Sequence, residues 1–322
     1  MEQQRRTVCI IGGTGFVGST LAPRLHEQGY RIKVLTRRRE RHRDLLVVPT
    51  LSLIEADVHD ERELVRHFEG CEAVINLAGI LNEHKGPPGE EFRQVHAELP
   101  RRIISACRRA GVRRYLHMSA LGAGEDAPSL YQRTKAEGER AALEGANETF
   151  RVTAFRPSVI FGPGDSFVRL FATLLWMAPG VMFLPTPEAR FKPVYVGDVA
   201  KAFLHALHDP DTAGRTYELC GPEVWTLREI VEYARSLMGV RRKIVGLSDR
   251  LSKLQARVLE RVPGKPYSMD NYLSSTVPNV CSEDGLGELG IRPTPMEAVV
   301  PGYVGPGHRQ DRYQDFRREA GR

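Results

Sequence analysis

The sequence predicts an α/β protein with a doubly wound parallel sheet and a smaller, interleaved C-terminal α/β lobe. Short apolar runs alternate with amphipathic helical segments through the first half of the chain, which is typical of parallel strands covered by helices on both faces. A glycine-rich turn follows the first run, where such sheets bind phosphate groups. After Gly164 the alternation is lost and prolines become frequent, which indicates a second structural unit.

Six apolar runs are expected to form the strands, because each is rich in β-branched and apolar residues and is bounded by turn residues. In chain order they read TVCIIGG, RIKVLT, LSLIEADV, AVINLAG, RYLHMSA and RVTAFRP, with helical segments between them. We therefore expect a sheet domain over residues 1–165 with a return segment at about 191–213. Residues 166–322 are expected to form the smaller lobe for substrate or partner.

Composition and charge place the chain among globular proteins that fold in water. Apolar residues make up 41% and charged residues 27%, and the formal net charge is +6. Basic clusters at 37–43 and in the tail at 308–322 are not set in a recognisable nucleic-acid-binding module, so we expect no nucleic-acid partner. The histidines and acidic residues after the fourth run show no ligand spacing, so we expect no metal.

The cysteines and the N-terminus predict a cytoplasmic protein. The first strand begins almost at Met1, so we expect no signal peptide. The cysteines are scattered and form no C-x-x-C pair, which is typical of reduced thiols. They are Cys9, Cys71, Cys107, Cys220 and Cys281.

The turn IIGGTGFVGSTL carries the strongest local signal. Gly12, Gly15 and Gly18 give the spacing G-x-x-G-x-x-G between the first strand and the first helix. Glycine permits the tight turn, lets a pyrophosphate approach the backbone, and allows close packing of helix on strand. We expect a dinucleotide here, also contacted by Thr14, Phe16 and Val17. The alternative is that the glycines serve only the turn.

Residues at the ends of the next strands predict the rest of the cofactor site. Arg37 and Arg38 stand where an NAD site usually has an acidic residue, and a guanidinium suits a 2′-phosphate. We therefore expect NADP, with NAD as second choice; the alternative is that both arginines are a solvated helix start. Further candidates follow the third and fourth strands, although simple strand-end chemistry would also explain them. They are Asp57 and Val58, expected to flank the adenine, and Leu77, Ala78 and Gly79, where small residues let the cofactor lie close to the backbone.

Six segments in family order give the sequence a close resemblance to the extended or atypical short-chain dehydrogenases/reductases. They read GGTGFVG, NLAG, Y-x-x-x-K at Tyr131 and Lys135, FRPSVIFGPGD, PVYVGDVAKAF and TYELCGPEVWTLREIV. MSALGA, RTKAEGE and KPVYVGDVA are most similar to the subgroup of the NAD(P)H-binding accessory subunit of respiratory complex I. The resemblance implies a Rossmann domain and bound NADPH, but not always turnover, and some relatives are linked to quinone metabolism.

The resemblance also assigns roles at the centre of the site. It implies Tyr131 as the acid/base. Lys135, one helical turn later, would lower the Tyr131 pKa by its charge together with that of the oxidised nicotinamide, and would hold the nicotinamide ribose. Ser119 would bind the substrate oxygen, but it stands alone between Met118 and Ala120, so a shift of one residue would leave no hydroxyl there.

The segment RPSV places three further residues beside the nicotinamide. Pro157 and Val159 are expected to contact it through their backbone. Arg156 either lies beside it or forms a structural ion pair.

The longest apolar stretch, Phe167 to Pro185, decides whether the sequence predicts contact with a membrane. It is interrupted and too short to span a bilayer, so we expect a buried helix followed by a loop, with contact to a membrane surface as the alternative.

The leading hypothesis is an oxidoreductase or epimerase-type enzyme acting on an apolar or quinone-like carbonyl or hydroxyl compound. The second is a cofactor-holding structural or assembly subunit of a membrane-associated respiratory or quinone-related complex.

Overall fold

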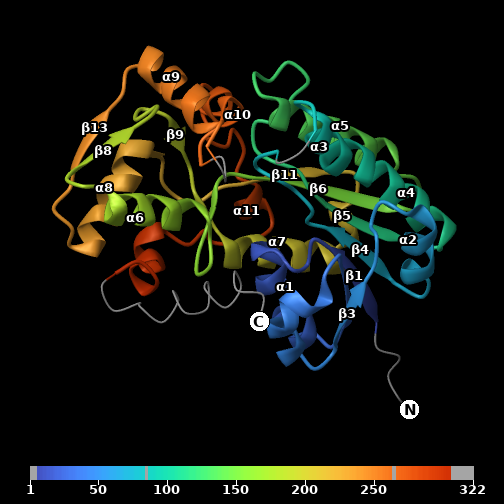
Figure 1. The fold of residues 1–322 in the computed structure, drawn as a ribbon. Coiled ribbons are helices and arrows are strands. Elements are labelled where there is room, and N and C mark those ends of the chain that lie inside the picture. The colour runs from blue at the N-terminus through green and yellow to red at the C-terminus, as the bar shows by residue number, and fades with distance from the viewer. Residues whose placement is uncertain (1–5, 84–85, 263–265, 306–322) are drawn as a thin grey trace.

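A seven-stranded parallel sheet forms the centre of the protein (Figure 1), with strand order β11-β6-β5-β4-β1-β2-β3. The computed structural model describes residues 6–83, 86–262 and 266–305, so the basic tail lies outside the described residues. The strands are β1 (Thr7–Ile11), β2 (Arg31–Thr36), β3 (Leu51–Glu55), β4 (Ala73–Asn76), β5 (Arg114–Met118), β6 (Arg151–Pro157) and β11 (Thr216–Leu219). The six predicted strands are confirmed.

The seventh strand does not come from the segment expected to return to the sheet. Within 191–213, β10 (Val194–Tyr195) pairs with β7 (Ile160–Phe161) in a separate two-stranded sheet. The helix that follows, α7 (Val196–His208), packs against α1 (Phe16–Glu27) on the central sheet. The edge strand is β11, which pairs with β6 so that Thr216 lies opposite Ala154.

Helices cover both faces of the sheet, which explains the near-continuous apolar strands. On β1, Val8 and Ile10 pack into the core under α1 and α7, whereas Cys9 and Ile11 pack into the opposite core. That second core lies under α2 (Glu61–Phe68), α4 (Leu99–Arg109) and α5 (Leu130–Glu144). The chain enters α4 through α3 (Glu90–Arg93) and a π-helical turn at Gln94–Glu98. Short 3-10 turns lie at Arg39–Val47, Pro210–Thr212, Met296–Ala298 and Val300–Gly302.

A third core lies in the smaller lobe, on the left of Figure 1. The elements of this lobe are α6 (Phe167–Met177), α8 (Leu227–Met238), α9 (Asp249–Leu259), α10 (Met269–Ser274), β8 (Val181–Leu184) with β13 (Lys243–Gly246), and β9 (Arg190–Phe191) with β12 (Trp225–Thr226). The short helix α11 (Gly285–Glu288) packs instead on β11 of the central sheet. The long apolar stretch was expected to be a buried helix and a loop. It forms instead α6 and β8, and both are half-exposed: Trp176, Met177 and Phe183 face solvent.

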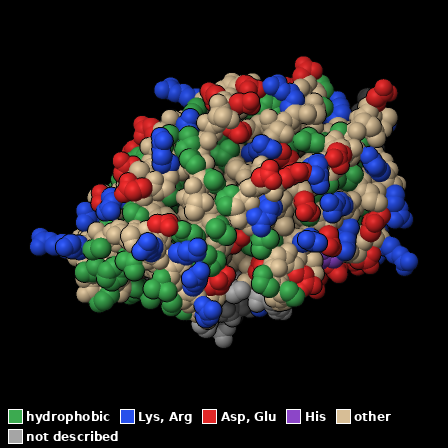
Figure 2. All heavy atoms as spheres, turned by 90° about the horizontal axis from the view of Figure 1, so that it is seen from above, with side chains coloured by type: hydrophobic (Ala, Val, Ile, Leu, Met, Phe, Trp, Pro, Cys, Tyr) green, Lys and Arg blue, Asp and Glu red, His purple; other side chains and the backbone are tan. Residues whose placement is uncertain are grey.

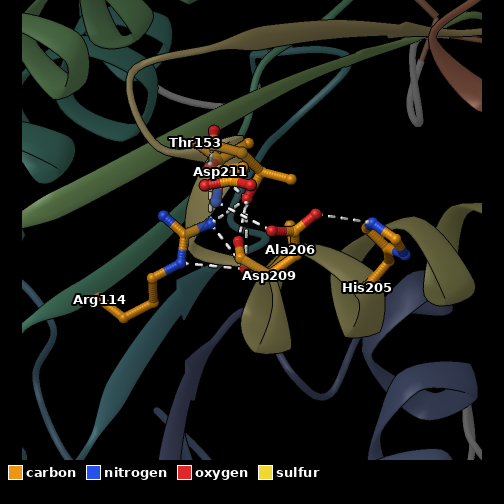
Figure 3. A network of polar contacts seen from close by, with 7 residues as sticks. Arg114, Thr153, His205, Ala206, Asp209 and Asp211 are labelled. Carbon is orange, nitrogen blue, oxygen red and sulfur yellow. Dashed lines mark hydrogen bonds and ion pairs between the residues drawn. The ribbon is translucent and has the colours of Figure 1, made fainter. Parts of the chain in front are cut away.

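A buried arginine joins β5 to the end of α7 (Figure 3). Nε and Nη2 of Arg114 donate to the carbonyl oxygen of Ala206 over 3.1 and 2.7 Å. Nη2 also donates to the hydroxyls of Thr153 and Thr212. The guanidinium therefore satisfies a terminal carbonyl of α7, at the end of the sheet opposite the carboxyl ends of the strands.

Two of the five cysteines are not free thiols, contrary to expectation. Cys220, just after β11, forms a disulfide with Cys281, with Cα atoms 6.1 Å apart. Cys9, Cys71 and Cys107 are buried free thiols. The prediction was wrong because spacing alone carries no information on two partners 61 residues apart.

Candidate functional site

Two glycines of the turn, Gly12 and Gly18, lie too close to neighbouring backbone to carry a side chain. Gly12 has φ +74°, and a Cβ there would lie 2.7 Å from the backbone nitrogen of Ala78. A Cβ on Gly18 would lie 2.3 Å from the carbonyl oxygen of Gly13. Gly15 precedes α1 and offers its first N–H groups no side-chain cap. These donors and the bare backbone, together with the first residues of α1, fit a pyrophosphate.

The expected adenosine contacts lie at neighbouring strand ends. Arg37 and Arg38 are exposed directly after β2. The carbonyl of Thr36 accepts a hydrogen bond from Ala56 N–H, so the end of β3 is adjacent. Asp57 is exposed and accepts from His59 N–H at the turn before α2, and Val58 packs partly against the core beneath it.

The segment after β4 connects the glycine turn to the centre of the site. Leu77 N–H donates to Ile11 at the end of β1 over 2.8 Å, and Ala78 N–H donates to the side chain of Asn76. Gly79 lies against Lys135: a Cβ on this glycine would be 3.1 Å from Nζ of the lysine. A side chain at position 79 would therefore crowd the ammonium group of Lys135.

Ser119, Tyr131 and Lys135 come from β5 and α5. Lys135 is buried, and Nζ donates to the carbonyl of Met118 over 3.2 Å. Ser119 follows β5 and is 2% exposed, and its hydroxyl has no hydrogen-bond partner in the described part of the chain. Met118 packs into the core under α1 and α7, and Ala120 offers no polar atom. Of the three residues weighed for this position, only Ser119 combines a hydroxyl with a place outside that core.

Burial shifts the pKa values of Tyr131 and Lys135 in the directions that favour the neutral form of each side chain. It raises the pKa of Tyr131 to about 12, with a smaller contribution from the carboxylate of Asp270. It lowers the pKa of Lys135 to about 8, opposed by Glu139. In the protein alone the Tyr131 pKa is therefore raised, and its expected lowering by Lys135 together with the oxidised nicotinamide stays a prediction.

His96 is a buried neighbour of the site that sequence reasoning passed over. Nε2 accepts a hydrogen bond from Ile80 N–H over 3.1 Å, so the other ring nitrogen carries the proton and donates to Thr134. The ring lies edge-on to Tyr131, with centroids 5.3 Å apart. Burial and Lys135 hold the His96 pKa well below its usual range, so the ring is neutral. Its signal in the sequence was only a histidine on the inner face of a helix.

Two residues of the smaller lobe also reach the site. Asp270 on α10 accepts hydrogen bonds from the backbone of Leu130 and Tyr131. Asn279 accepts from the hydroxyl of Ser158 over 2.6 Å and from Val159 N–H over 3.1 Å. The backbone N–H of Val159 therefore already has a partner within the protein.

Arg156 forms the structural ion pair that was one of its two expected roles. Nε and Nη2 donate to both carboxylate oxygens of Glu139, at 2.6 to 3.1 Å. Glu139 lies one helical turn after Lys135, so the pair ties α5 to β6 beside the lysine. Pro157 ends β6 next to it and is buried.

A cavity of about 350 Å³ lies against the first turn of α5. Its wall includes Phe92, Leu130, Met269, Asp270 and Leu273, together with Arg133. Apolar surface predominates in the wall, but Asn82, Glu83, Glu260 and Ser268 also line it. The smaller lobe contributes one side, and Ser119, Tyr131 and Lys135 are not among the lining residues.

The sequence pattern of the "NAD dependent epimerase/dehydratase family" matches residues 8–220, about two thirds of the chain. The chain belongs to the NAD-dependent epimerase/dehydratase family. This assignment confirms the resemblance to extended short-chain dehydrogenases, and it accounts for the glycine turn and for the parallel sheet that the match covers.

Relatives of this family member are found among respiratory subunits and lipid enzymes. It is 29% identical to the mouse mitochondrial NADH dehydrogenase [ubiquinone] 1 alpha subcomplex subunit 9, over 89% of this chain and 77% of that one. It is 30% identical to a ceramide reductase of Caulobacter vibrioides, over 76% of this chain and 74% of the reductase. A dTDP-glucose 4,6-dehydratase of Streptomyces venezuelae, solved with NAD and TYD bound, shares the fold with a TM-score of 0.71. The two chains are 19% identical, and the match covers 97% of this chain and 98% of the dehydratase.

Two further observations on this epimerase/dehydratase family member concern metal ions and membrane-spanning helices. Among the described residues, no three His, Cys, Asp or Glu side chains are grouped so that they could hold a metal ion. Over the same part of the chain, no helix combines the length and the apolar character needed to cross a bilayer.

Proposed function

We propose that this protein is a nicotinamide-dependent oxidoreductase that reduces or oxidises an apolar carbonyl or hydroxyl compound. One observation carries the proposal: the hydroxyl of Ser119 is buried without a partner among the described residues, and the residue before it, Met118, accepts a hydrogen bond from Lys135. Buried hydroxyls in folded proteins are nearly always hydrogen-bonded, so an unpaired one next to the contact of Lys135 supports a substrate oxygen at this position.

Each residue then has a distinct role. Tyr131 gives its phenolic proton to the substrate oxygen during reduction and takes it back during oxidation. Ser119 donates a hydrogen bond to that oxygen and fixes its position. Lys135 holds the nicotinamide ribose, and its charge favours the tyrosinate when proton transfer occurs. A bound nicotinamide dinucleotide supplies the hydride donor or acceptor.

The remaining cofactor contacts are proposed from the positions of these residues at the ends of neighbouring strands. The glycine turn at 12–18 takes the pyrophosphate, and the segment 77–79 lies along the dinucleotide toward Lys135. Asp57 and Val58 flank the adenine, and Pro157 and Val159 adjoin the nicotinamide. Arg37 and Arg38 favour NADP, because both are exposed at the strand end where a 2′-phosphate would lie. The family description names NAD, so the measured preference decides between the two.

The substrate class rests on the cavity and on one relative. The cavity against the first turn of α5 has the volume of a small-molecule site, and apolar surface predominates in it although Glu83, Arg133, Glu260 and Asp270 also line it. The relative from Caulobacter is named a ceramide reductase, which acts on a lipid by its name. Both support an apolar carbonyl compound. We propose that residues 1–165 hold the cofactor and that the later lobe, interleaved with them, completes the substrate side.

A second function is favoured by the similarity to a complex I subunit. A relative 29% identical over 89% of this chain carries that name. In this alternative the protein binds a nicotinamide dinucleotide, performs no turnover and associates with a membrane-bound respiratory complex. The bound cofactor would then stabilise the fold by about 3 to 4 kcal/mol at saturating concentration.

Tyr131→Phe separates the two functions. We expect the wild type to oxidise NADPH with a ceramide-type ketone or a quinone, and the variant to lose about 100-fold or more of that rate. NADPH affinity should stay within about twofold. Tyr233→Phe, in the core of the smaller lobe, is the matched control and should keep full activity. A wild type that binds NADPH tightly and turns over none of these compounds would favour the subunit function.

A further inference from the structure

Helix α9 exposes an apolar stripe that the protein itself leaves uncovered. Leu251, Leu254 and Val258 are 51% to 56% exposed and follow one another at helical spacing. Phe183 on the adjacent β8 is 56% exposed, and its carbonyl accepts a hydrogen bond from Gln255 of α9. We call these four side chains the α9 face. Large apolar side chains grouped on a surface mark a site of interaction.

The opposite side of α9 shows why this stripe faces outward. Ser252 and Ala256 are the buried positions of the helix, and the Ser252 hydroxyl accepts a hydrogen bond from Thr186 N–H over 3.0 Å. The protein core therefore holds α9 through its two small residues. Three of its large apolar residues, Leu251, Leu254 and Val258, are left on the outside, and Leu259 is half-buried. An ordinary amphipathic helix on a globular protein turns such residues inward.

Basic side chains run beside the apolar stripe. Arg250, Lys253 and Arg257 each precede a stripe residue by one position, so they lie about 100° around the helix axis from it. All three are exposed. Residues 235–262 contain eight Lys and Arg against two acidic residues, a net +6 that equals the formal net charge of the whole chain. Figure 2 shows hydrophobic side chains with Lys and Arg beside them on the left, over the smaller lobe.

We propose that the α9 face docks on the surface of an anionic phospholipid bilayer. A helix that lies in a membrane interface needs an apolar stripe to enter the acyl boundary and adjacent Lys and Arg to meet the headgroups. α9 has both, and each basic side chain near an anionic surface strengthens binding about fivefold. The one-sided positive charge favours a lipid surface over a protein partner, whose interface core is depleted of lysine.

Docking at α9 would bring the bilayer next to the cavity. Glu260, directly after α9, lines the cavity together with Met269 and Leu273 of α10. An apolar substrate could then pass from the bilayer to the first turn of α5 without crossing water. This last step rests on the proposed function, whereas the docking does not.

Vesicle flotation of the full chain tests the docking. The protein is mixed with vesicles of phosphatidylcholine that contain phosphatidylglycerol, or with vesicles of phosphatidylcholine alone, and the bound fraction is measured without cofactor or substrate. We expect binding to the anionic vesicles that falls with added salt, and little binding to the neutral ones. Turnover is not measured, so the proposed activity can fail while the docking stands.

Three variants locate the surface. Arg250→Gln/Lys253→Gln/Arg257→Gln should weaken binding about 100-fold, at about fivefold per charge. Leu251→Ser/Leu254→Ser/Val258→Ser should abolish binding while leaving the unfolding transition in place, because these side chains are already exposed. The matched control Arg62→Gln/Arg66→Gln/Arg101→Gln removes three exposed arginines from α2 and α4 and should bind like the wild type.

A reporter on the face adds a direct measurement. The emission of Leu254→Trp should shift to the blue on anionic vesicles, since that position would enter the acyl boundary. The proposal is overturned if the wild type ignores anionic vesicles, or if the control variant loses as much binding as the α9 arginine variant. It is also overturned if the wild type is a dimer that the serine variant makes monomeric with no vesicle binding, because the face would then serve a second copy.

Discussion

The Asp270 carboxylate holds the backbone N–H of Tyr131 at 3.1 Å and that of Leu130 at 2.7 Å. These are the first two N–H groups of α5, and Ser129 accepts from the third, that of Gln132. An acceptor 139 residues further along the chain therefore completes the N-terminus of the helix that carries Tyr131 and Lys135.

Asp270→Asn should change the pH dependence of turnover. The carboxylate raises the Tyr131 pKa, so its removal lowers that pKa. Tyr131 must be protonated to act as the acid in reduction, and the rate falls as pH rises through its pKa. In the variant, we expect the fall of kcat/KM to begin at lower pH, measured in the direction of carbonyl reduction. An unchanged profile with lower activity throughout would mean that Asp270 only supports the helix.

Lys135→Met should stabilise the fold while it removes activity. Burial lowers the Lys135 pKa from its ordinary 10.5 to about 8, which costs the folded protein about 3 kcal/mol at pH 7. Losing the hydrogen bond to Met118 offsets about 1 kcal/mol of the gain. We expect the free energy of unfolding of the variant, measured in urea at pH 7, to be about 2 kcal/mol higher than that of the wild type.

The direction in which stability changes with pH follows from the lowered pKa of Lys135. Between pH 8 and 10.5 the unfolded lysine binds more protons than the folded one, so wild-type stability rises with pH over this range. The advantage of Lys135→Met should therefore shrink toward pH 10.5. Lys201→Met, at a lysine half-exposed on α7, is the control and should give no comparable gain.

Opening the disulfide should loosen the site as well as the fold. Cys220 and Cys281 close a loop of 61 residues, for which chain entropy gives about 4 kcal/mol as an upper figure. Asn279, two residues before Cys281, binds Ser158 and Val159. We expect Cys220→Ser/Cys281→Ser to lower Tm and to weaken nicotinamide cofactor binding. Cys107→Ser, at a buried free thiol, controls for the loss of a cysteine; an unchanged cofactor affinity in the double variant would separate the disulfide from the site.

Arg37→Ala/Arg38→Ala should weaken NADPH binding much more than NADH binding. Hydrogen bonds to a charged phosphate contribute about 1.5 to 3 kcal/mol each, so the Kd for NADPH should rise about tenfold or more. The Kd for NADH should stay within about threefold. Arg41→Ala, on the exposed turn that follows, is the control. Equal losses for both cofactors would contradict a 2′-phosphate site at these residues.

The sequence was sufficient for the parts of the molecule that local patterns determine. The six strand runs and the glycine turn were predictable because burial on both faces and close backbone approach leave a direct mark on residue type. Asp270 and Cys281 left no such mark, since their partners lie far away along the chain. The raised Tyr131 pKa was also hidden, because it depends on burial that only the assembled lobes produce.

The position of Asp270 and Asn279 has a consequence for biosynthesis. During synthesis the first 160 residues can fold into most of the central sheet, because their strands and helices are neighbours in the chain. The contacts that order the start of α5 and the Ser158–Val159 turn form only after about 120 more residues have left the ribosome. A nascent or truncated chain would therefore carry the glycine turn without an ordered centre, and the proposed activity would require the later part of the chain.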